Sequence, residues 1–432
     1  MRFLIENFGC QMNDHDMEKM ASVLIDHGHS VALSVEDADI VIVNTCCIRQ
    51  KAEQKFFSLM GRLQHARKRT GLILGVTGCV AEQEKENIFE RLPFIDFSLG
   101  PSNIHKIAEA VENAKVNIRT EGFGDNGRSP SLFIRPHNTR NGVKGFVTIM
   151  KGCNNFCSYC VVPYVRGREE SRPSADVLSE VREMAERGMI EITLLGQNVN
   201  SYNNGNSDLS FPQLLRKIDE IPEISRIRFV TSHPKDISQE LIECFGSLRT
   251  LCESIHLPFQ SGSDRILALM NRGYTSGDYR GKVEALKKQC PGIAITADCI
   301  VGFPGETDED HRATVELMGR IRPDTINITR YSPRPGTEAA RARSQVPGWM
   351  SKERSRELTA LRADIGMGLN LSRVGMEEGI LITERGKEGT MIGRTDAYRP
   401  VAVRGDHPIG TRLAVVITDA APSYLIGEAV GT

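Results

Sequence analysis

The sequence contains no long hydrophobic run. None of its stretches reaches the roughly 18 consecutive apolar residues of a membrane-spanning helix, and its first ten residues, MRFLIENFGC, lack the apolar segment of a secretory signal peptide. The formal net charge of the 432 residues is only −1, so the total charge by itself gives no indication of a nucleic-acid partner. We therefore expect a cytoplasmic protein that does not associate with a membrane.

Length and composition indicate a multidomain globular chain. Hydrophobic residues make up 40% and charged residues 25% of the sequence, which is typical of globular proteins. A chain of 432 residues exceeds one ordinary core, so two or three domains are expected. Its eleven cysteines, in a chain expected to be cytoplasmic, favour metal ligation or redox chemistry over disulfide bonds.

Three of these cysteines lie close together in the run KGCNNFCSYCVVPYVRGREESRP. The spacing C-x3-C-x2-C of Cys153, Cys157 and Cys160 places three thiolates in one short loop. Iron–sulfur clusters usually take four cysteines, so this loop suits a [4Fe–4S] cluster whose fourth iron is open to a substrate or cofactor. The alternative is half a zinc site or three buried thiols. Zinc sites favour paired C-x2-C units closed by four ligands, and the sequence offers no fourth ligand nearby.

The first 116 residues alternate short apolar strands with helical stretches. Strands are expected at residues 3–8, 40–44 and 73–77, and helices near 16–27, 53–65 and 82–91. This alternation predicts an open parallel α/β sheet with helices on its faces.

Three further cysteines each follow one of these strands. Cys10, Cys46 and Cys79 would lie at the carboxyl edge of the sheet, where ligands of open α/β folds bind, and would form a second set of three thiolates. A single cysteine at such a place is often only a small buried apolar residue. Cys47 leaves two choices at the second position.

The rest of the chain predicts two further parts. Residues 117–138 are polar and rich in glycine, as a linker would be. Residues 139–370 predict an incomplete (β/α)6 barrel with its chemistry at the carboxyl ends of the strands, and residues 371–432 predict a small antiparallel β-barrel. The strands of the larger barrel are expected at residues 146–150, 191–195, 226–231, 254–257, 294–300 and 325–330.

The basic residues are concentrated in two segments. Seven basic residues and one acidic residue lie from Arg49 to Arg69, and seven basic and two acidic residues lie from Arg135 to Arg172. Such segments are typical of a surface that binds a polyanion, although the first fits a solvated helix face equally well. The basic residues are Arg49, Lys51, Lys55, Arg62, Arg67, Lys68 and Arg69 in the first segment, and Arg135, Arg140, Lys144, Lys151, Arg166, Arg168 and Arg172 in the second.

Long motifs spread over most of the chain resemble a known enzyme family. The motifs are ENFGCQMND, VNTCCIRQKAEQKFFSLMGRL, GVTGCVAEQ, the cysteine loop with Tyr159, TSHP, HLPFQSGSDRIL, DCIVGFPGETDED and YSPRPGTEA. Together they are similar to the methylthiotransferases, which are radical S-adenosylmethionine (SAM) enzymes. Within that family, NFGCQMN and CVVPYVRGREESRP resemble the tRNA 2-methylthio-dimethylallyladenosine synthases. The resemblance implies a methylthiotransferase domain at 1–116, a radical SAM core at 139–370 and an RNA-binding TRAM domain at 371–432.

The resemblance also implies cofactors, partners and a reaction. One [4Fe–4S] cluster on Cys153, Cys157 and Cys160 would bind and cleave SAM, and a second on the other three cysteines would supply sulfur. The reaction would add a methylthio group at C2 of dimethylallyladenosine. That C–H is beyond acid–base chemistry, so a cofactor must supply a radical. The implied partners are the anticodon loop of tRNA and a reduced flavodoxin- or ferredoxin-type electron donor, and we expect a monomer.

Two features depart from the family pattern. Cys47 stands where a residue that binds no iron is expected. Residues 371–432 carry seven basic against eight acidic residues, so the presumed RNA-binding barrel is not basic. Attraction of tRNA is therefore expected mainly from the two basic segments.

Several residues past the ends of barrel strands are candidates for SAM contacts. The turn that contains Gly302 could let a cofactor approach the backbone closely, but it fits an ordinary strand-to-helix turn equally well. A hydrogen-bonded turn is also the simpler explanation of the polar pairs. The candidates are Tyr159, Gln197, Asn198, Ser232, His233, Gly302, Gly305 and Glu306.

Other functions stay open at this point. Related enzymes modify threonylcarbamoyladenosine in tRNA or an aspartate of a ribosomal protein. A non-catalytic iron–sulfur or zinc protein that binds RNA would share the basic segments and the terminal barrel. Only an enzyme explains an open three-cysteine loop in a β/α barrel together with a second set of three cysteines.

Overall fold

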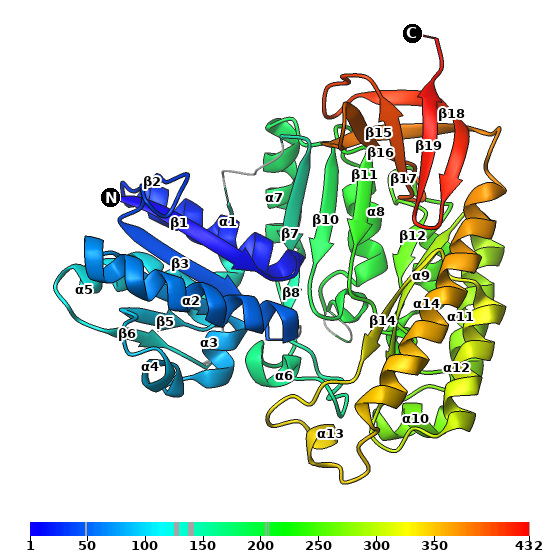
Figure 1. Ribbon diagram of the computed structural model, residues 1–432. Helices are drawn as coiled ribbons and strands as arrows, with labels where there is room; N and C mark the ends of the chain where they lie inside the picture. The colour runs from blue at the N-terminus through cyan, green and yellow to red at the C-terminus, as the bar shows by residue number, and fades with distance from the viewer. Residues whose placement is uncertain (48–49, 125–128, 137–141, 204, 206, 432) are drawn as a thin grey trace.

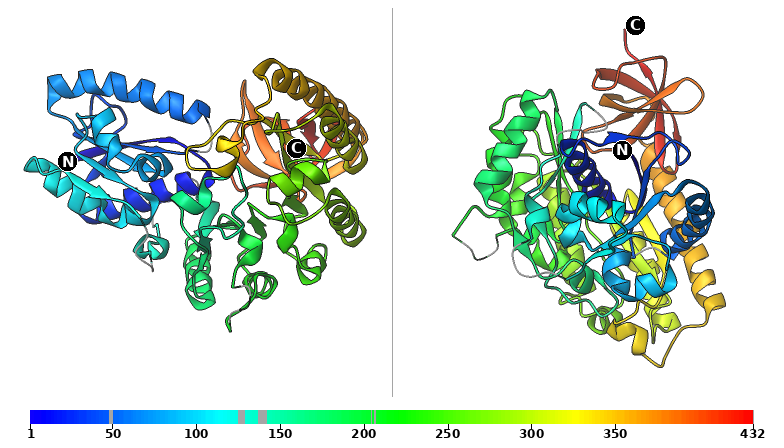
Figure 2. Two further views of the ribbon diagram at one scale, coloured as in Figure 1. Left: turned by 90° about the horizontal axis from the view of Figure 1, so that it is seen from below. Right: turned by 90° about the vertical axis from the view of Figure 1, so that its left-hand side faces the viewer.

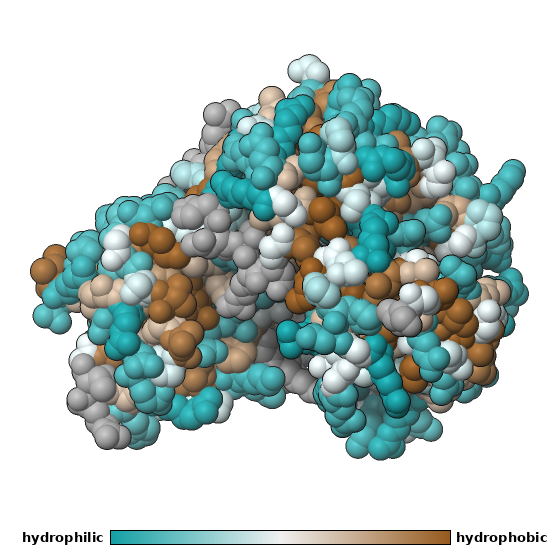
Figure 3. Space-filling view, turned by 90° about the horizontal axis from the view of Figure 1, so that it is seen from above, coloured by the Kyte–Doolittle hydropathy of each residue, from teal (hydrophilic) through white to brown (hydrophobic). Residues whose placement is uncertain are grey.

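The computed structural model describes residues 1–432 except 48–49, 125–128, 137–141, 204, 206 and 432. Three parts follow one another along the chain, as Figure 1 shows: an N-terminal α/β sheet, a β/α barrel and a C-terminal β-barrel. On the face seen from above, hydrophilic side chains are interspersed with small apolar groups (Figure 3). Among the described helices, none has both the length and the apolar character needed to cross a membrane.

The N-terminal part is an open sheet whose neighbouring strands are all parallel, which confirms the prediction. The order is β2-β1-β3-β4-β5-β6. The short strands β2, β5 and β6 were not predicted, because two or three residues show no periodicity. The bounds are β1 Arg2–Phe8, β2 Ser30–Val31, β3 Ile40–Thr45, β4 Ile73–Gly78, β5 Phe97–Leu99 and β6 Thr120–Gly122.

Helices cover both faces of this sheet because its central strands are apolar on both sides. Val41 and Val43 of β3 pack with one set of helices, and Ile40 and Ile42 pack with the other, since successive side chains of a strand point to opposite faces. The predicted helix near 82–91 is two short helices, broken at Lys85. The helices are α2 (Gln50–Thr70), α3 (Cys79–Glu84) and α4 (Asn87–Arg91) on the first face, and α1 (Gln11–Asp26) and α5 (Ile107–Lys115) on the second.

The predicted linker, residues 117–138, contains ordered structure. Its strand β6 extends the N-terminal sheet, and a 3-10 turn at Pro130–Phe133 buries Leu132. The carbonyl oxygen of Ser131 accepts a hydrogen bond from Lys19 of α1 at 3.1 Å. Residues 117–138 therefore contain a strand and a turn that pack on the N-terminal part, residues 125–128 and 137–138 lie outside the described part, and the role of the segment as a linker stays a prediction.

The central part is an incomplete barrel built from all six predicted strands. Two parallel three-stranded sheets, β7-β10-β11 and β12-β13-β14, lie side by side, and the single bridge between Ile227 and Leu251 forms near their junction. Helix α1 of the N-terminal part lies against β7 (Figures 1 and 2). The strands are β7 Lys144–Thr148, β10 Glu191–Leu195, β11 Arg226–Phe229, β12 Ser254–His256, β13 Ala294–Val301 and β14 Thr325–Arg330.

A layer of helices packs on the outer face of the barrel and shares one apolar core with the strands. Two of these helices begin with capping boxes, Thr275 with Asp278 and Thr307 with Asp310, which satisfy the first free N–H groups of each helix. The layer consists of α7 (Ser174–Glu186), α8 (Phe211–Asp219), α9 (Gln239–Cys244), α11 (Ser276–Gln289) and α12 (Asp308–Ile321), and α14 (Gly348–Leu371) leads to the last part.

The C-terminal part is a closed five-stranded barrel of order β15-β16-β17-β19-β18. Its pairs are antiparallel as predicted, except that β17 and β19 run parallel. The strands are β15 Glu377–Arg385, β16 Thr390–Arg394, β17 Pro400–Arg404, β18 Arg412–Ala421 and β19 Tyr424–Ala429.

Candidate functional site

The first candidate site lies at the carboxyl edge of the N-terminal sheet. The register aligns Phe8 with Thr45 and Thr45 with Gly78, so β1, β3 and β4 end side by side. Cys10, Cys46 and Cys79, here called the N-terminal triplet, follow these ends directly. Gly78 has φ 92°, and a Cβ there would lie 2.4 Å from Asn44 Oδ1, so only glycine fits this approach.

A buried asparagine network fixes the loops around the triplet. The amide of Asn44 donates to Asn7 Oδ1 at 3.1 Å and to the Asn13 carbonyl oxygen at 2.9 Å. Asn13 in turn accepts a hydrogen bond from the thiol of Cys10 at 3.4 Å. The three loops are therefore held together by side chains that sequence reasoning did not single out.

The surroundings of the triplet favour thiolates. A hydrogen bond from Cys46 and the positive charge of Arg166 lower the pKa of Cys10 to about 6. A hydrogen bond from Cys47 and the same arginine lower the pKa of Cys79 to about 7. The contact with Cys79 and burial raise the pKa of Cys47, whose side chain belongs to the apolar core on the α2 face. Cys46 contacts Cys10 and Cys47 contacts Cys79, so the choice of Cys46 over Cys47 stays a prediction.

The triplet offers the thiolate donors that an iron–sulfur cluster takes. Within the described part of the chain, no three His, Cys, Asp or Glu side chains converge as ligands of one metal ion would. Cluster iron is held by thiolates, because cysteine thiols lose their protons on coordination. Three cysteines on adjacent strand ends, two of them with lowered pKa values, match that donor set.

The second candidate site is the cluster loop, residues 152–169, which leaves the carboxyl end of β7. Two short antiparallel strands, β8 (Met150–Lys151) and β9 (Glu170–Ser171), close its base. Gly152 has φ 75°, and a Cβ there would lie 2.0 Å from the Arg168 carbonyl oxygen, so the tight base requires glycine. The Cys160 N–H donates to the Cys157 carbonyl oxygen at 2.9 Å.

Two thiols of the cluster loop have raised pKa values, whereas two thiols of the triplet have lowered ones. Burial raises the pKa of Cys153 to about 11 and that of Cys160 to about 12. Arg272, from the loop before α11, donates to the sulfur of Cys157 at 3.4 Å and to the Pro258 carbonyl oxygen at 3.2 Å. Among the described residues no carboxylate forms an ion pair with this buried arginine. An anionic cluster on the loop would provide its countercharge. Arg272 was not predicted as a site residue, because a single arginine in ALMNRGYT shows no pattern.

Four of the predicted SAM contacts have free polar atoms, and two of these residues, Gln197 and Asn198, hydrogen-bond the cluster loop. The Gly152 N–H donates to Gln197 Oε1, and the Asn198 amide donates to Asp236 at 2.8 Å. The His233 ring accepts the Lys235 N–H at 3.2 Å, and burial lowers its pKa to about 2. Each has a buried polar atom with no hydrogen-bond partner among the described residues, as a polar cofactor site requires. These atoms are Gln197 Nε2, Asn198 Oδ1, Ser232 Oγ and His233 Nε2.

The polar groups of the turn after β13, which was predicted to contact SAM, are bonded within the chain. The carboxylate of Glu306 accepts the Gly302 N–H at 3.1 Å and pairs with Arg354 of α14 at 2.6 Å. The Gly305 N–H donates to the Ser344 carbonyl oxygen at 2.7 Å. The polar groups of Gly302, Gly305 and Glu306 thus join the barrel to the segment that leads to α14 and to that helix itself, and their contact with SAM stays a prediction.

Tyr159 is a residue of the cluster loop, and its contact with SAM stays a prediction. Its ring meets the edge of Phe303 at a centroid distance of 6.4 Å, and its hydroxyl accepts a hydrogen bond from Arg272 at 3.5 Å. Burial raises the pKa of this phenol well above its usual value, so it stays neutral. Tyr159 thus packs the loop against the turn after β13.

Many charges of the two basic segments are neutralised inside the chain. Five of these residues form ion pairs within the chain, whereas Lys55 and Arg62 of α2 and Arg168 are exposed, and the contact of the two segments with a polyanion stays a prediction. Arg49 and Arg140, and the side chains of Lys51, Lys68 and Arg69, lie outside the described part. The ion pairs are Arg67 with Asp96, Arg135 with Glu183, Lys151 with Glu170, Arg166 with Asp16, and Arg172 with Glu180.

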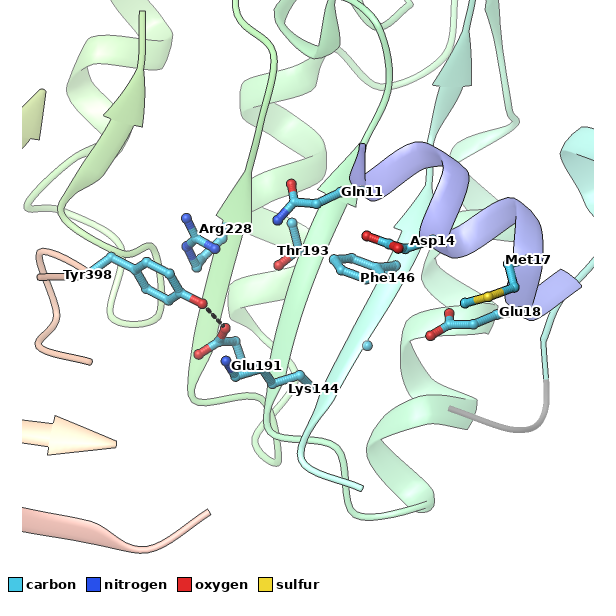
Figure 4. A pocket seen from close by; sticks show the side chains of 11 residues that line it. Gln11, Asp14, Met17, Glu18, Lys144, Phe146, Glu191, Thr193, Arg228 and Tyr398 are labelled. Atoms are coloured by element: carbon cyan, nitrogen blue, oxygen red, sulfur yellow. Dashed lines mark hydrogen bonds between the residues drawn. The ribbon is translucent and has the colours of Figure 1, made fainter. Parts of the chain in front are cut away.

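A cavity of about 350 Å³ lies between α1 and the inner face of β7, β10 and β11 (Figure 4). Gln11 lines it from α1, and Lys144 and Glu191 line it from the amino ends of their strands. Tyr398 of the C-terminal barrel closes it and donates to Glu191 Oε1 at 3.0 Å. The cluster loop leaves the opposite ends of the strands, so this cavity does not lie at the cluster loop.

Family comparisons agree with the three parts. The radical SAM superfamily matches residues 147–318, the TRAM domain matches residues 371–430, and the uncharacterized protein family UPF0004 matches residues 2–100. Among solved structures, TsrM from Kitasatospora setae, a radical SAM methyltransferase with bound cobalamin and [4Fe–4S] cluster, has a TM-score of 0.60 at 15% identity. The match covers 78% of this chain and 74% of that chain and shows the fold alone. Fold and cysteine loop thus define a radical SAM protein.

Two relatives that match nearly the whole chain show to which family of radical SAM proteins it belongs. A tRNA-2-methylthio-N(6)-dimethylallyladenosine synthase of Geobacter sulfurreducens is 47% identical over 432 residues, which span 99% of this chain and 97% of the relative. One of Syntrophus aciditrophicus is 45% identical over 98% of this chain and 93% of the relative. The chain belongs to the family of the tRNA-2-methylthio-N(6)-dimethylallyladenosine synthases.

Proposed function

We propose that this protein adds a methylthio group to C2 of N6-dimethylallyladenosine, next to the anticodon of tRNA. The observation that carries the proposal is the N-terminal triplet, which three adjacent strands bring to one sheet edge in a chain that also has the cluster loop. A radical SAM enzyme that only abstracts hydrogen needs one cluster. A second set of thiolates supplies the place for a sulfur donor, and the named relatives carry out the corresponding reaction.

The cofactors that fit are two [4Fe–4S] clusters and SAM. Bound to the two cysteine sets, they would supply hydrogen abstraction from an unactivated C–H bond and delivery of sulfur, which side chains alone cannot provide. The chain has to place the two sets on one substrate atom and keep water away from it. Close packing of the cluster loop against the N-terminal part by Val161 and Val165 serves that positioning.

The polar atoms around the cluster loop are proposed to bind SAM. Its methionine moiety carries an amino group and a carboxylate, and its ribose carries hydroxyl groups. The free buried atoms of Asn198, Ser232 and His233 offer an acceptor, a hydroxyl and a ring nitrogen for them. Because the His233 ring is neutral, its second nitrogen would carry the proton and donate.

We propose that the anticodon loop binds beside the cluster loop. Tyr164 is 58% exposed there, its ring meets the edge of Phe156, and the guanidinium of Arg168 lies 4.3 Å from the centroid of the Phe156 ring. Aromatic and arginine side chains stack on unpaired bases, and RNA recognition favours bases that are splayed out of a loop. Lys55 and Arg62 of α2, seven residues apart and both exposed, are proposed phosphate contacts.

We also propose an electron donor, an oligomeric state and domain bounds for this protein. Reductive cleavage of SAM consumes one electron, and a reduced flavodoxin- or ferredoxin-type protein is the proposed donor in the cytoplasm. We propose that a monomer is sufficient, because one chain supplies both cysteine sets. The proposed division is residues 1–116, a connecting segment at 117–138, a core at 139–370 and a terminal domain at 371–432.

The test is nucleoside mass spectrometry of tRNA treated with the reconstituted, full-length protein under anaerobic conditions. Prenylated tRNA should gain a methylthio group much faster than the same tRNA without the prenyl group, because an apolar group buried on binding contributes about 25 cal/mol per Å². A chain with Cys10, Cys46 and Cys79 replaced by alanine is the matched control, and it should still cleave SAM. Equal turnover of both tRNAs, or activity only on threonylcarbamoylated tRNA or a ribosomal protein, would contradict the proposed substrate.

A further inference from the structure

The segment that follows the cluster loop cysteines is built into the N-terminal part. Helix α6, Val162–Val165, begins two residues after Cys160. Its Val165 and the preceding Val161 are buried in the same apolar core as Cys79. The segment from Cys160 to Arg166 is therefore short and packed against the core that contains Cys79, and Arg166 at its end is fixed relative to both cysteine sets.

Arg166 points from α6 into the N-terminal triplet. Its side chain is 7% exposed and pairs with Asp16 at 2.8 Å between Nη2 and Oδ2. The same nitrogen lies 3.5 Å from Asn13 Oδ1, and the guanidinium hydrogen-bonds the sulfur of Cys79. An arginine that the sequence presented as part of a basic segment is thus a buried group beside three thiols.

Arg166 lies between one carboxylate and two thiols of the N-terminal triplet. Arg166 is the cation that lowers the pKa of both Cys10 and Cys79. Asp16, which is 4% exposed, is the carboxylate paired with it among the described residues. A cluster on three thiolates is anionic and becomes more so on reduction. Hydrogen bonds to the sulfurs and nearby charge set the potential of such clusters.

We propose that Arg166 raises the reduction potential of the cluster on the N-terminal triplet by hydrogen-bonding its cysteine sulfur and compensating its charge. This inference rests on the proposed function, which places a cluster there. Arg166 acts on the cluster through Cys79 and is a positioning residue. A raised potential keeps the sulfur-bearing cluster reducible under the strongly reducing conditions in which SAM is cleaved. Because α6 continues from the cluster loop, the same contact ties the two cysteine sets together.

The experiment isolates the proposed cluster. The full-length chain with Cys153, Cys157 and Cys160 replaced by alanine is reconstituted, and the midpoint potential is measured by redox titration followed by electron paramagnetic resonance. Arg166→Gln should lower the midpoint so that the reduced-to-oxidised ratio at a fixed potential falls at least about tenfold, which is about 59 mV for one electron. Arg166→Lys keeps the charge and should recover most of the shift. Arg168→Gln, which removes an exposed arginine two residues away, should leave the midpoint unchanged.

Each result of this experiment either supports or overturns the inference about Arg166. A full iron content with the same midpoint in Arg166→Gln would overturn the inference, as would an equal shift in Arg168→Gln. If Arg166→Gln and Arg166→Lys both fail to hold iron, Asp16→Asn decides in their place, because removing the carboxylate should raise the midpoint. An unchanged midpoint there overturns the inference. If the background chain with Arg166 intact binds no iron at all, the assignment of the cluster in the proposed function fails together with it.

Discussion

Arg399 and Asp324 form an ion pair of 2.6 Å between Nη2 and Oδ1, which joins the C-terminal barrel to the turn before β14. The contact lies in the loop between β16 and β17, where Tyr398 also binds Glu191 and Asp396 pairs with Arg226 at 3.0 Å. All three partners stand at the amino ends of central strands. The terminal barrel is therefore attached at the end of the barrel opposite the cluster loop, and its attachment can be tested separately from the chemistry.

Arg399→Ala should destabilise this attachment. Both side chains are mostly buried, at 12% and 15% exposure, so the change leaves the Asp324 carboxylate without its cation. Breaking such a pair costs about 2–4 kcal/mol. Thermal unfolding of the apo-protein should show an earlier transition than the parent. The control is Arg385→Ala, whose partner Asp406 is 3.9 Å away and 84% exposed, and which should change stability by less than about 0.5 kcal/mol. Equal transitions for both variants would refute the role of the pair.

The two cysteine sets should load iron independently. Anaerobic reconstitution of the parent chain should approach eight irons per protein, and alanine at all three positions of either set should halve that content. Loss of the cluster loop cysteines should abolish SAM cleavage, whereas loss of the N-terminal triplet should abolish only sulfur transfer. Cys47→Ser should keep both clusters, because Cys46, which contacts Cys10, is the predicted ligand after β3. Iron analysis that shows a loss in Cys47→Ser would move the ligand assignment by one residue.

The architecture was predictable from sequence because its signals are local. Strand β3, IVIVNT, is buried at every position. Its short apolar run is typical of a strand that is covered on both faces. The cysteines at strand ends were predictable because parallel neighbours end at one edge. Short strands such as β6 gave no signal. It forms only because β5 offers a free edge to three residues that show no alternation.

The environment of the sites was not predictable, because it depends on contacts between distant residues. Arg67 is basic in the sequence, but Asp96 lies 29 positions away in the chain and binds it through two nitrogens, one at 2.7 Å. Arg166 and Arg272 reach cysteines in other segments in the same way. Charge counted along a sequence says nothing of pairing. The same limit applies to Glu306, which looked available but binds Arg354.

Binding of tRNA should depend on the exposed charges of α2 rather than on Arg67. Lys55→Glu with Arg62→Glu should weaken binding and reduce the slope of log affinity against log salt by roughly 1.4, at about 0.7 for each lost phosphate contact. Arg67→Glu should instead lower stability, because it breaks the pair with Asp96. Fluorescence anisotropy with an anticodon stem-loop at several salt concentrations measures the slope.

The matched control for this experiment is a charge reversal away from the proposed surface. Arg312 and Arg320 of α12 are 71% and 56% exposed on the outer layer of the barrel. Reversing both changes the net charge of the protein by the same amount as the α2 variant. If the two double variants weaken binding equally, the effect is one of total charge and α2 is not a contact surface.

The buried His233 ring should make the apo-protein less stable in acid. Its pKa is lowered from 6.5 to about 2 by burial first and by the charge of Arg272, so the folded chain does not protonate it above that value. The unfolded chain does so below about pH 6.5. This group therefore contributes no pH dependence above pH 6.5, and stability is lost as the pH falls from there toward 2, by up to about 1.4 kcal/mol per pH unit.

His233→Asn isolates this contribution, because asparagine can still accept the Lys235 N–H as a cap but does not titrate. Between pH 7 and pH 5, the free energy of unfolding of the parent should fall by about 2 kcal/mol more than that of the variant. Denaturant unfolding of the two apo-proteins at both pH values measures the difference. His256→Asn is compared with His233→Asn, because it removes another histidine of the barrel. The ring of His256 is partly exposed and bonded to Asp298 at 3.1 Å. Parallel pH curves for the parent and His233→Asn would show that the His233 ring is protonated in the folded state, and its proposed role as a neutral donor to SAM would then be wrong.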